Sequence, residues 1–97
     1  MNHADHVRLI EAGLERDSGG VWAEFGAGGG AFTLALREIA GPNVEIVAVD
    51  EDRGSLRYLR DAMGRQFPGT HLQLLEADFA GDLTLPPLDG ILSANAI

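Results

Sequence analysis

The stretch that decides the fold is 21–30, VWAEFGAGGG. Its first half is a short apolar run typical of a buried strand, interrupted by one acid, Glu24, and its second half is a glycine-rich turn. Glycine permits positive φ angles there and lets the backbone approach a ligand with no Cβ atom in the way. Helical spacing follows at once, so the stretch predicts a strand, a tight turn and a helix whose free N–H groups point toward the turn.

Predicted helices and strands alternate along the whole chain. Apolar residues at helical spacing predict three helices, over 3–16, 32–39 and 54–67. Apolar and β-branched runs predict four strands, over 21–25, 44–49, 71–76 and 91–97. Gly41 and Pro42 are expected to end the second helix, and Asp52 to cap the third. This alternation builds a parallel sheet through right-handed crossovers, so we expect one α/β domain over 1–97.

Composition excludes several classes of protein. The chain has 97 residues, 15 of them acidic and 7 basic, a formal charge of −8, and no cysteine. Disulfide frameworks and cysteine-ligated metal sites are therefore excluded, and the acidic balance argues against nonspecific binding to nucleic acids. Three histidines, His3, His6 and His71, form no obvious group, so no metal site is expected. With no apolar run of membrane-spanning length and no secretory leader, we expect a cytoplasmic protein without a membrane anchor.

Three acidic residues are expected at the carboxyl ends of three strands. Glu24 interrupts the first strand, Asp50 closes the second and Asp78 follows the third. Parallel strands end at one edge of the sheet, where such folds bind ligands, so these acids are expected to share a site. Alternatives remain for each: an exposed edge residue for Glu24, the start of a turn for Asp50, and the cap of the next loop for Asp78.

Two segments resemble motifs of the class I S-adenosylmethionine-dependent methyltransferases. The stretch 21–30 resembles the first motif, an acid followed by a turn of alternating glycines, and VAVD at 47–50 resembles the second. The resemblance implies that Asp50 binds the ribose and that Glu24 faces the cofactor's ammonium group or anchors the turn. From these two motifs the implied cofactor-binding residues are Glu24, Gly26, Ala27, Gly28, Gly30, Asp50 and Glu51.

The resemblance continues toward the end of the chain. EADF at 76–79 resembles the adenine-contacting segment, in which Asp78 would bind the exocyclic amine and Phe79 would lie against the ring. LDGILSAN at 88–95 resembles the fourth motif and places Asn95 on the acceptor side as the candidate catalytic residue. The implied fold is a Rossmann-like parallel sheet of about four strands with three helices, an incomplete class I fold. The implied activity is methyl transfer from S-adenosylmethionine.

Two other functions stay open at this point. Gly26, Gly28 and Ala31 also fit the dinucleotide fingerprint loosely, which makes NAD an alternative cofactor. A pyrophosphate prefers few acids nearby, whereas three carboxylates suit a ligand that carries a sulfonium, an ammonium and a diol. The second alternative is a catalytically inert binding or assembly module that keeps the fold without the activity.

The length raises a question about the last predicted strand. The family's sheet normally has seven strands with the fourth in mid-sheet, whereas here the apolar fourth strand would form a free edge at the end of the chain. Parallel sheets are normally covered on both faces, and apolar edges are normally protected. Either this sequence is part of a longer chain or its edge is covered by another molecule. We therefore expect self-association through 91–97.

Overall fold

The four predicted strands form one parallel sheet in the computed structural model, which describes residues 3, 16–26, 28, 30–77 and 87–92. The strand order is β3-β2-β1-β4. The strands are β1 (Val21–Phe25), β2 (Glu45–Asp50), β3 (His71–Glu76) and β4 (Gly90–Leu92). The α/β class and the parallel pairing predicted from the sequence are confirmed, whereas residues 93–97 of the predicted last strand lie outside the described residues.

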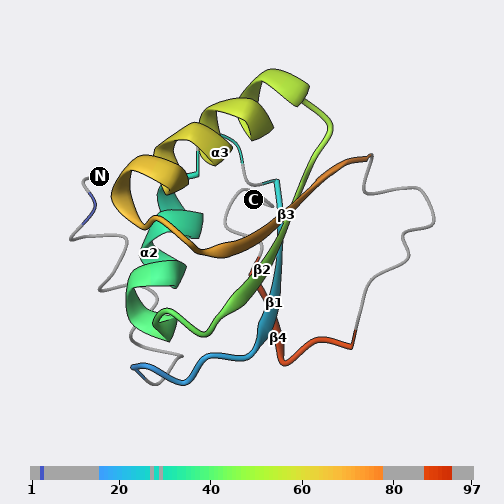
Figure 1. The fold of residues 1–97 in the computed structure, drawn as a ribbon. Coiled ribbons are helices and arrows are strands. Elements are labelled where there is room, and N and C mark those ends of the chain that lie inside the picture. The colour runs from blue at the N-terminus through green and yellow to red at the C-terminus, as the bar shows by residue number, and fades with distance from the viewer. Residues whose placement is uncertain (1–2, 4–15, 27, 29, 78–86, 93–97) are drawn as a thin grey trace.

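Two helices, α2 (Ala31–Ala40) and α3 (Arg53–Gln66), pack side by side on one face of the sheet (Figure 1). Both were predicted within two residues of their observed ends. Of the predicted helix over 3–16, all but residues 3 and 16 lie outside the described residues. The described part of the chain contains no helix with the length and apolar character needed to cross a membrane.

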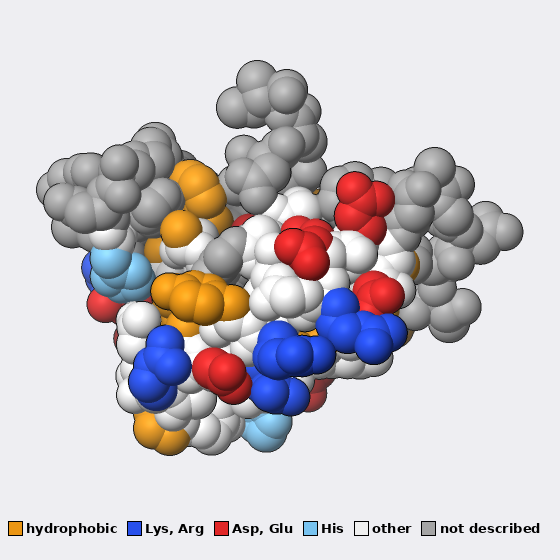
Figure 2. Space-filling model, turned by 90° about the horizontal axis from the view of Figure 1, so that it is seen from above, with side chains coloured by type: hydrophobic (Ala, Val, Ile, Leu, Met, Phe, Trp, Pro, Cys, Tyr) orange, Lys and Arg blue, Asp and Glu red, His pale blue; other side chains and the backbone are white. Residues whose placement is uncertain are grey.

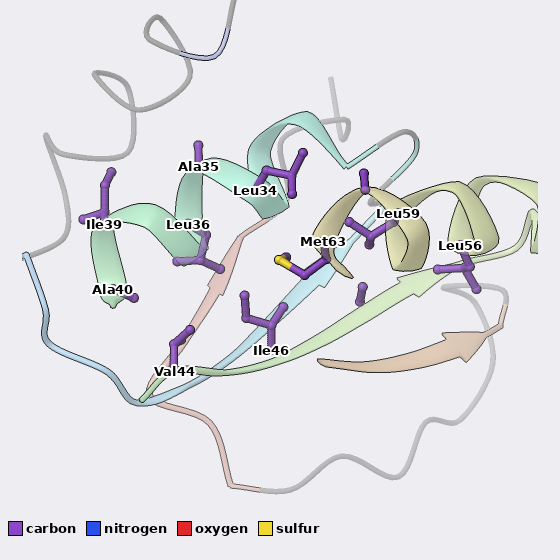
Figure 3. Close-up of a cluster of buried hydrophobic side chains, with 12 residues drawn as sticks. Leu34, Ala35, Leu36, Ile39, Ala40, Val44, Ile46, Leu56, Leu59 and Met63 are labelled. Atoms are coloured by element: carbon purple, nitrogen blue, oxygen red, sulfur yellow. The ribbon is translucent and has the colours of Figure 1, made fainter. Parts of the chain in front are cut away.

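The main core lies between these helices and the sheet (Figure 3). The predicted apolar stripes contribute Leu36 and Ile39 from α2 and Leu59 from α3, each at most 1% exposed, and Ile46 of β2 packs beneath them. Full burial of an aliphatic side chain of this size stabilises the fold by roughly 1.5–3 kcal/mol. This core therefore holds the two helices against the sheet, and with them the turns at its carboxyl edge.

Short-range contacts set the ends of the two helices. The Asp52 carboxylate accepts hydrogen bonds from the Gly54 amide at 3.0 Å and the Ser55 hydroxyl at 2.9 Å, which confirms it as the N-cap of α3. Those bonds, the one from Ser55 first, hold the pKa of Asp52 below its ordinary value. Gly41, with a φ of 90°, ends α2 as predicted and returns its N–H to the Arg37 carbonyl.

A second, smaller cluster lies on the other face of the sheet. It consists of Ala23, Val47 and Val49, with Phe25 and Leu75 packed against them. Neither described helix covers this face (Figure 1). The edge strand β4 adds Ile91 next to Ala23, with 60% of its surface exposed. The predicted apolar edge is therefore present in the described part of β4.

Candidate functional site

The glycine turn lies at the carboxyl edge of the sheet, between β1 and α2. It is held to the neighbouring strand by the Gly26 amide, which donates to the Val49 carbonyl at 2.9 Å. Gly28 and Gly30 have φ angles of 55° and 89°, a region that favours glycine. Gly30 also faces α3, because a Cβ atom there would come within 2.5 Å of Leu59 Cδ1. This close approach brings the start of α2 against the core helix.

Helix α2 begins at Gly30 without a side-chain cap and with no acidic residue in its first turn. The backbone N–H groups at a helix start carry partial positive charge. The end of α2 beside the glycine turn is therefore suited to a carboxylate or another anionic group of a ligand.

Asp50 joins the glycine turn to the end of β2. Its Oδ2 accepts the Gly28 N–H at 2.8 Å, and its Oδ1 accepts the Asp52 N–H at 2.8 Å. The second bond is what a turn-starting aspartate makes, as one alternative expected, but the first spans 22 residues and is not required by a local turn. A carboxylate offers about four acceptor positions, so this half-buried group retains capacity for the two hydroxyls of a diol.

Glu24 is buried in the site, with 1% of its surface exposed, so the alternative of an exposed edge residue is wrong. Its Oε2 accepts a short hydrogen bond from the hydroxyl of Thr33 on α2, which ties β1 to the helix after the glycine turn. Burial raises the pKa of Glu24 from 4.5 to about 7, and the bond from Thr33 limits this rise. The bond therefore connects the two elements that flank the glycine turn.

The substitution Glu24→Gln is expected to remove a pH dependence of stability. A buried acid with a raised pKa binds its proton more tightly in the folded than in the unfolded chain, so stability falls as the pH rises from 4.5 to 7. Glutamine keeps a carbonyl acceptor for the Thr33 hydroxyl without the charge. Urea unfolding should show the variant more stable than the parent by about 1 kcal/mol at pH 5 and by about 3 kcal/mol at pH 8. An equal difference at both values would contradict the burial of a charge at this position.

A third acid at this edge was not among the predicted site residues. Glu76 ends β3 and is the register partner of Asp50, and its Oε2 lies 2.6 Å from Arg53 Nε at the start of α3. Both side chains are largely exposed. The pair therefore lies beside Asp50, at the end of the neighbouring strand. Like the hydrogen bond between Thr33 and Glu24, this ion pair joins residues of two different elements, so no local sequence motif predicts it.

The predicted site residues fall into two groups. Glu24, Gly26, Gly28, Gly30 and Asp50 come together around the glycine turn, and Glu51 lies exposed directly after Asp50. The remaining predicted residues lie outside the described residues: Ala27, Asp78, Phe79 and Asn95. Among the residues that the structure describes, no group of three or more histidines and acids could hold a metal ion.

Comparison with curated proteins finds a relative that is similar in sequence. A curated sequence from Thermoplasma volcanium, named as a probable cobalt-precorrin-6B C(15)-methyltransferase (decarboxylating), is 32% identical over 75 residues. The match covers 76% of this chain and 37% of that protein. The chain thus spans little more than a third of the length of this relative. No family model matches the sequence.

Two solved structures with the same fold are named as methyltransferases. Coclaurine N-methyltransferase bound to N-methylheliamine and SAH superimposes with a TM-score of 0.75 at 20% identity, over 94% of this chain and 26% of that one. Precorrin-6y C5,15-methyltransferase from Geobacter metallireducens superimposes with a TM-score of 0.70 at 23% identity, over 94% of this chain and 46% of that one. At these identities the structures establish a shared fold.

Together the parallel sheet, the glycine turn at its carboxyl edge and the acid at the end of β2 define a Rossmann-like ligand-binding fold. With the fold match and the sequence match taken together, the chain belongs to the class I S-adenosylmethionine-dependent methyltransferase family, as its motifs predicted.

Proposed function

We propose that the chain binds S-adenosylmethionine at the carboxyl ends of β1, β2 and β3 and forms the cofactor-binding part of a methyltransferase. The observation that carries this proposal is the hydrogen bond from the Gly28 amide to Asp50. It brings the glycine turn against an acid with acceptor capacity for a ribose diol. The same bond is unfavourable for a pyrophosphate ligand, because it occupies an amide that such a ligand would use and places a negative charge beside it.

The proposed cofactor matches the site group by group. Its carboxylate suits the start of α2, and its ribose hydroxyls suit Asp50. The hydrogen bond from the Thr33 hydroxyl to the buried Glu24 carboxylate would hold the glycine turn in place. The adenine contacts assigned to Asp78 and Phe79, the acceptor-side role of Asn95, and the roles of Ala27 and Glu51 remain part of the proposal on the strength of the motifs.

In the proposed reaction the sulfonium of the bound cofactor supplies an activated methyl group, and the chain's own contribution is position and alignment. The curated relative and one of the structural neighbours are named as precorrin methyltransferases, so a precorrin is the acceptor to assay first. A cytoplasmic location fits this proposal. The alternative is an inert module that binds the cofactor, or nothing, without transferring a methyl group.

Calorimetric titration separates the two candidate cofactors and identifies a module that binds neither. The full 97-residue chain is titrated with S-adenosylmethionine and, in parallel, with NAD under the same conditions. We expect saturable binding of S-adenosylmethionine and at least about tenfold weaker binding of NAD, the equivalent of 1.4 kcal/mol. The opposite preference would assign a nicotinamide cofactor, and no heat from either ligand would favour the inert module.

We further propose that the chain self-associates through its C-terminal strand, 91–97. Ile91 on the edge strand β4 is 60% exposed, and no described helix covers the adjacent face of the sheet. Sedimentation velocity at micromolar concentration should show a dimer or larger species, and Ile91→Lys should shift it toward monomer without loss of folded signal in circular dichroism. A parent chain that stays monomeric under these conditions would contradict the proposal.

A further inference from the structure

A groove lies on the far side of α3 from α2, between the C-terminal half of that helix and the edge strand β3. Its volume is about 410 Å³, within the range of ligand and side-chain pockets, and its walls are mainly apolar. Met63, Phe67, Leu72 and Leu74 form these walls, and Arg60 lies among the lining residues. The cofactor site proposed above uses none of them, so the groove is a separate feature of the molecule.

The groove is held in a fixed shape by contacts behind its wall. The Arg37 guanidinium lies 4.8 Å from the centre of the Phe67 ring, and its Nε donates to the Thr70 hydroxyl oxygen at 2.9 Å. The Thr70 hydroxyl in turn donates to the Phe67 carbonyl at 2.7 Å. These bonds fix the turn after α3. An incoming side chain would therefore meet a preformed surface, and binding would cost less free energy for ordering the groove.

Gly64 is one of the residues that line the groove. It lies inside α3, where glycine costs about 1 kcal/mol relative to alanine, and an added Cβ atom would meet nothing within 4 Å. No packing contact of the described chain therefore explains this glycine. A side chain at this position would instead occupy space along the groove.

Arginine side chains run along the helix beside the groove. In a chain with 7 basic and 15 acidic residues, four of the arginines lie on α3. Arg53, Arg57 and Arg60 follow one another at spacings of four and three, which places them in one row, and Figure 2 shows basic side chains in a row across this face. Arg53 is paired with Glu76, Arg60 has only a 3.4 Å contact to the exposed Asp61, and Arg57 has no hydrogen-bond partner among the described residues.

The neighbouring strand β3 is an edge of the described sheet. It pairs only with β2, extends over six residues, and contains neither proline nor lysine or arginine, the residues that commonly protect such edges. Its residues Leu72 and Leu74 are half-buried and face the groove. An edge strand beside a helix with an apolar groove between them is the geometry in which an extended peptide adds a strand to a sheet.

We propose that this surface binds an extended acidic segment of another protein. The segment adds as a strand along β3, places one apolar side chain in the groove, and pairs its carboxylates with Arg57 and Arg60. A second copy of this chain fits less well. Antiparallel pairing of two β3 edges relates the copies by a twofold axis through the sheet, which would put both arginine rows on the same face, opposite one another.

Fluorescence polarisation with a designed peptide tests the proposal on the full chain. The probe is a labelled seven-residue peptide in which threonine alternates with one leucine and two glutamates. We expect it to bind at least about tenfold more tightly than the same peptide with lysine in place of glutamate. Methylation of the backbone nitrogens that would pair with β3 should reduce binding by a similar factor, since it removes the donors of a strand ladder.

Two variants locate the site. Arg57→Glu with Arg60→Glu is expected to reverse the preference between the acidic and basic peptides. Gly64→Leu should fill the groove and abolish binding while the helix stays folded, because leucine is the better helix former and the space is open.

Equal binding of both peptides, or binding that survives methylation and Gly64→Leu, would overturn the proposal. If the chain self-associates and the Gly64→Leu substitution abolishes this self-association, the occupant of the surface is a second copy, and the proposal of an acidic segment is overturned. Asp50→Ala should leave peptide binding unchanged, so this surface can fail or hold independently of the cofactor site.

Discussion

Replacement of Asp50 by alanine is expected to weaken S-adenosylmethionine binding at least about a hundredfold. The two ribose hydroxyls of the cofactor would lose the carboxylate that accepts their hydrogen bonds. Hydrogen bonds to a charged group contribute roughly 1.5–3 kcal/mol each. The substitution also releases the Gly28 amide, so the glycine turn would no longer be held against β2. Isothermal titration of parent and variant chains measures the change in the dissociation constant.

The matched control for this prediction is Asp61→Ala. Asp61 is an exposed acid on α3 whose contact is with the neighbouring Arg60, so its removal changes the net charge equally without touching the site. Its affinity for S-adenosylmethionine should stay within about twofold of the parent, because an exposed ion pair contributes little. If both variants bind equally well, or both lose affinity equally, Asp50 has no specific role in binding the cofactor. Circular dichroism before each titration verifies that the variants are folded.

Gly30→Ala is expected to destabilise the chain by about 2–5 kcal/mol. With a φ of 89°, alanine at this position would cost roughly 1–2 kcal/mol of backbone strain. Its Cβ atom would in addition lie 2.5 Å from Leu59 Cδ1, and such overpacking of a well-filled core costs typically about 1–3 kcal/mol. Urea unfolding monitored by circular dichroism gives the difference in the free energy of unfolding.

Gly69→Ala separates the two causes. Gly69 has a similar φ of 84°, but an added Cβ atom there would meet nothing within 4 Å. Its substitution should therefore cost only the backbone strain, about 1–2 kcal/mol. A larger loss for Gly30→Ala than for Gly69→Ala measures the contact of the turn with α3. Equal losses would mean that Leu59 adjusts freely and that the turn is not held by the core helix.

Local patterns in the sequence were sufficient for the order of the elements. The spacing of Leu36 and Ile39, the helix end at Gly41 and the cap at Asp52 each depend on neighbours a few residues away, and all three are as predicted. The parallel pairing followed from the alternation of strands and helices. Of the last predicted strand, 91–97, the structure describes only Ile91 and Leu92, and both lie in β4 (Gly90–Leu92).

The contacts that shape the site depend on residues far apart in the chain. Asp50 was predicted as a site residue, but its bond to the Gly28 amide is known only from the structure. The sequence left two roles open for Glu24, and its burial against Thr33 supports the role of an anchor. The contact of Thr33 with Glu24 had one available signal in the sequence. Thr33 is a lone hydroxyl residue on the buried side of α2, three residues after Gly30. The groove beside β3 has no sequence signal at all, because it arises where α3 ends over the strand.

The most direct test of the proposed cofactor site is to identify the residues of the folded chain that respond to S-adenosylmethionine. Heteronuclear NMR of the 15N-labelled protein reports each backbone amide during a titration with the cofactor. We expect the amide resonances of Gly28, Gly30 and Asp52 to shift, and those of Gly64 and Thr70 in the groove beside β3 to stay in place. Saturable shifts confined to the groove, or no shift at the glycine turn at saturating cofactor, would contradict a cofactor site at the carboxyl edge of the sheet.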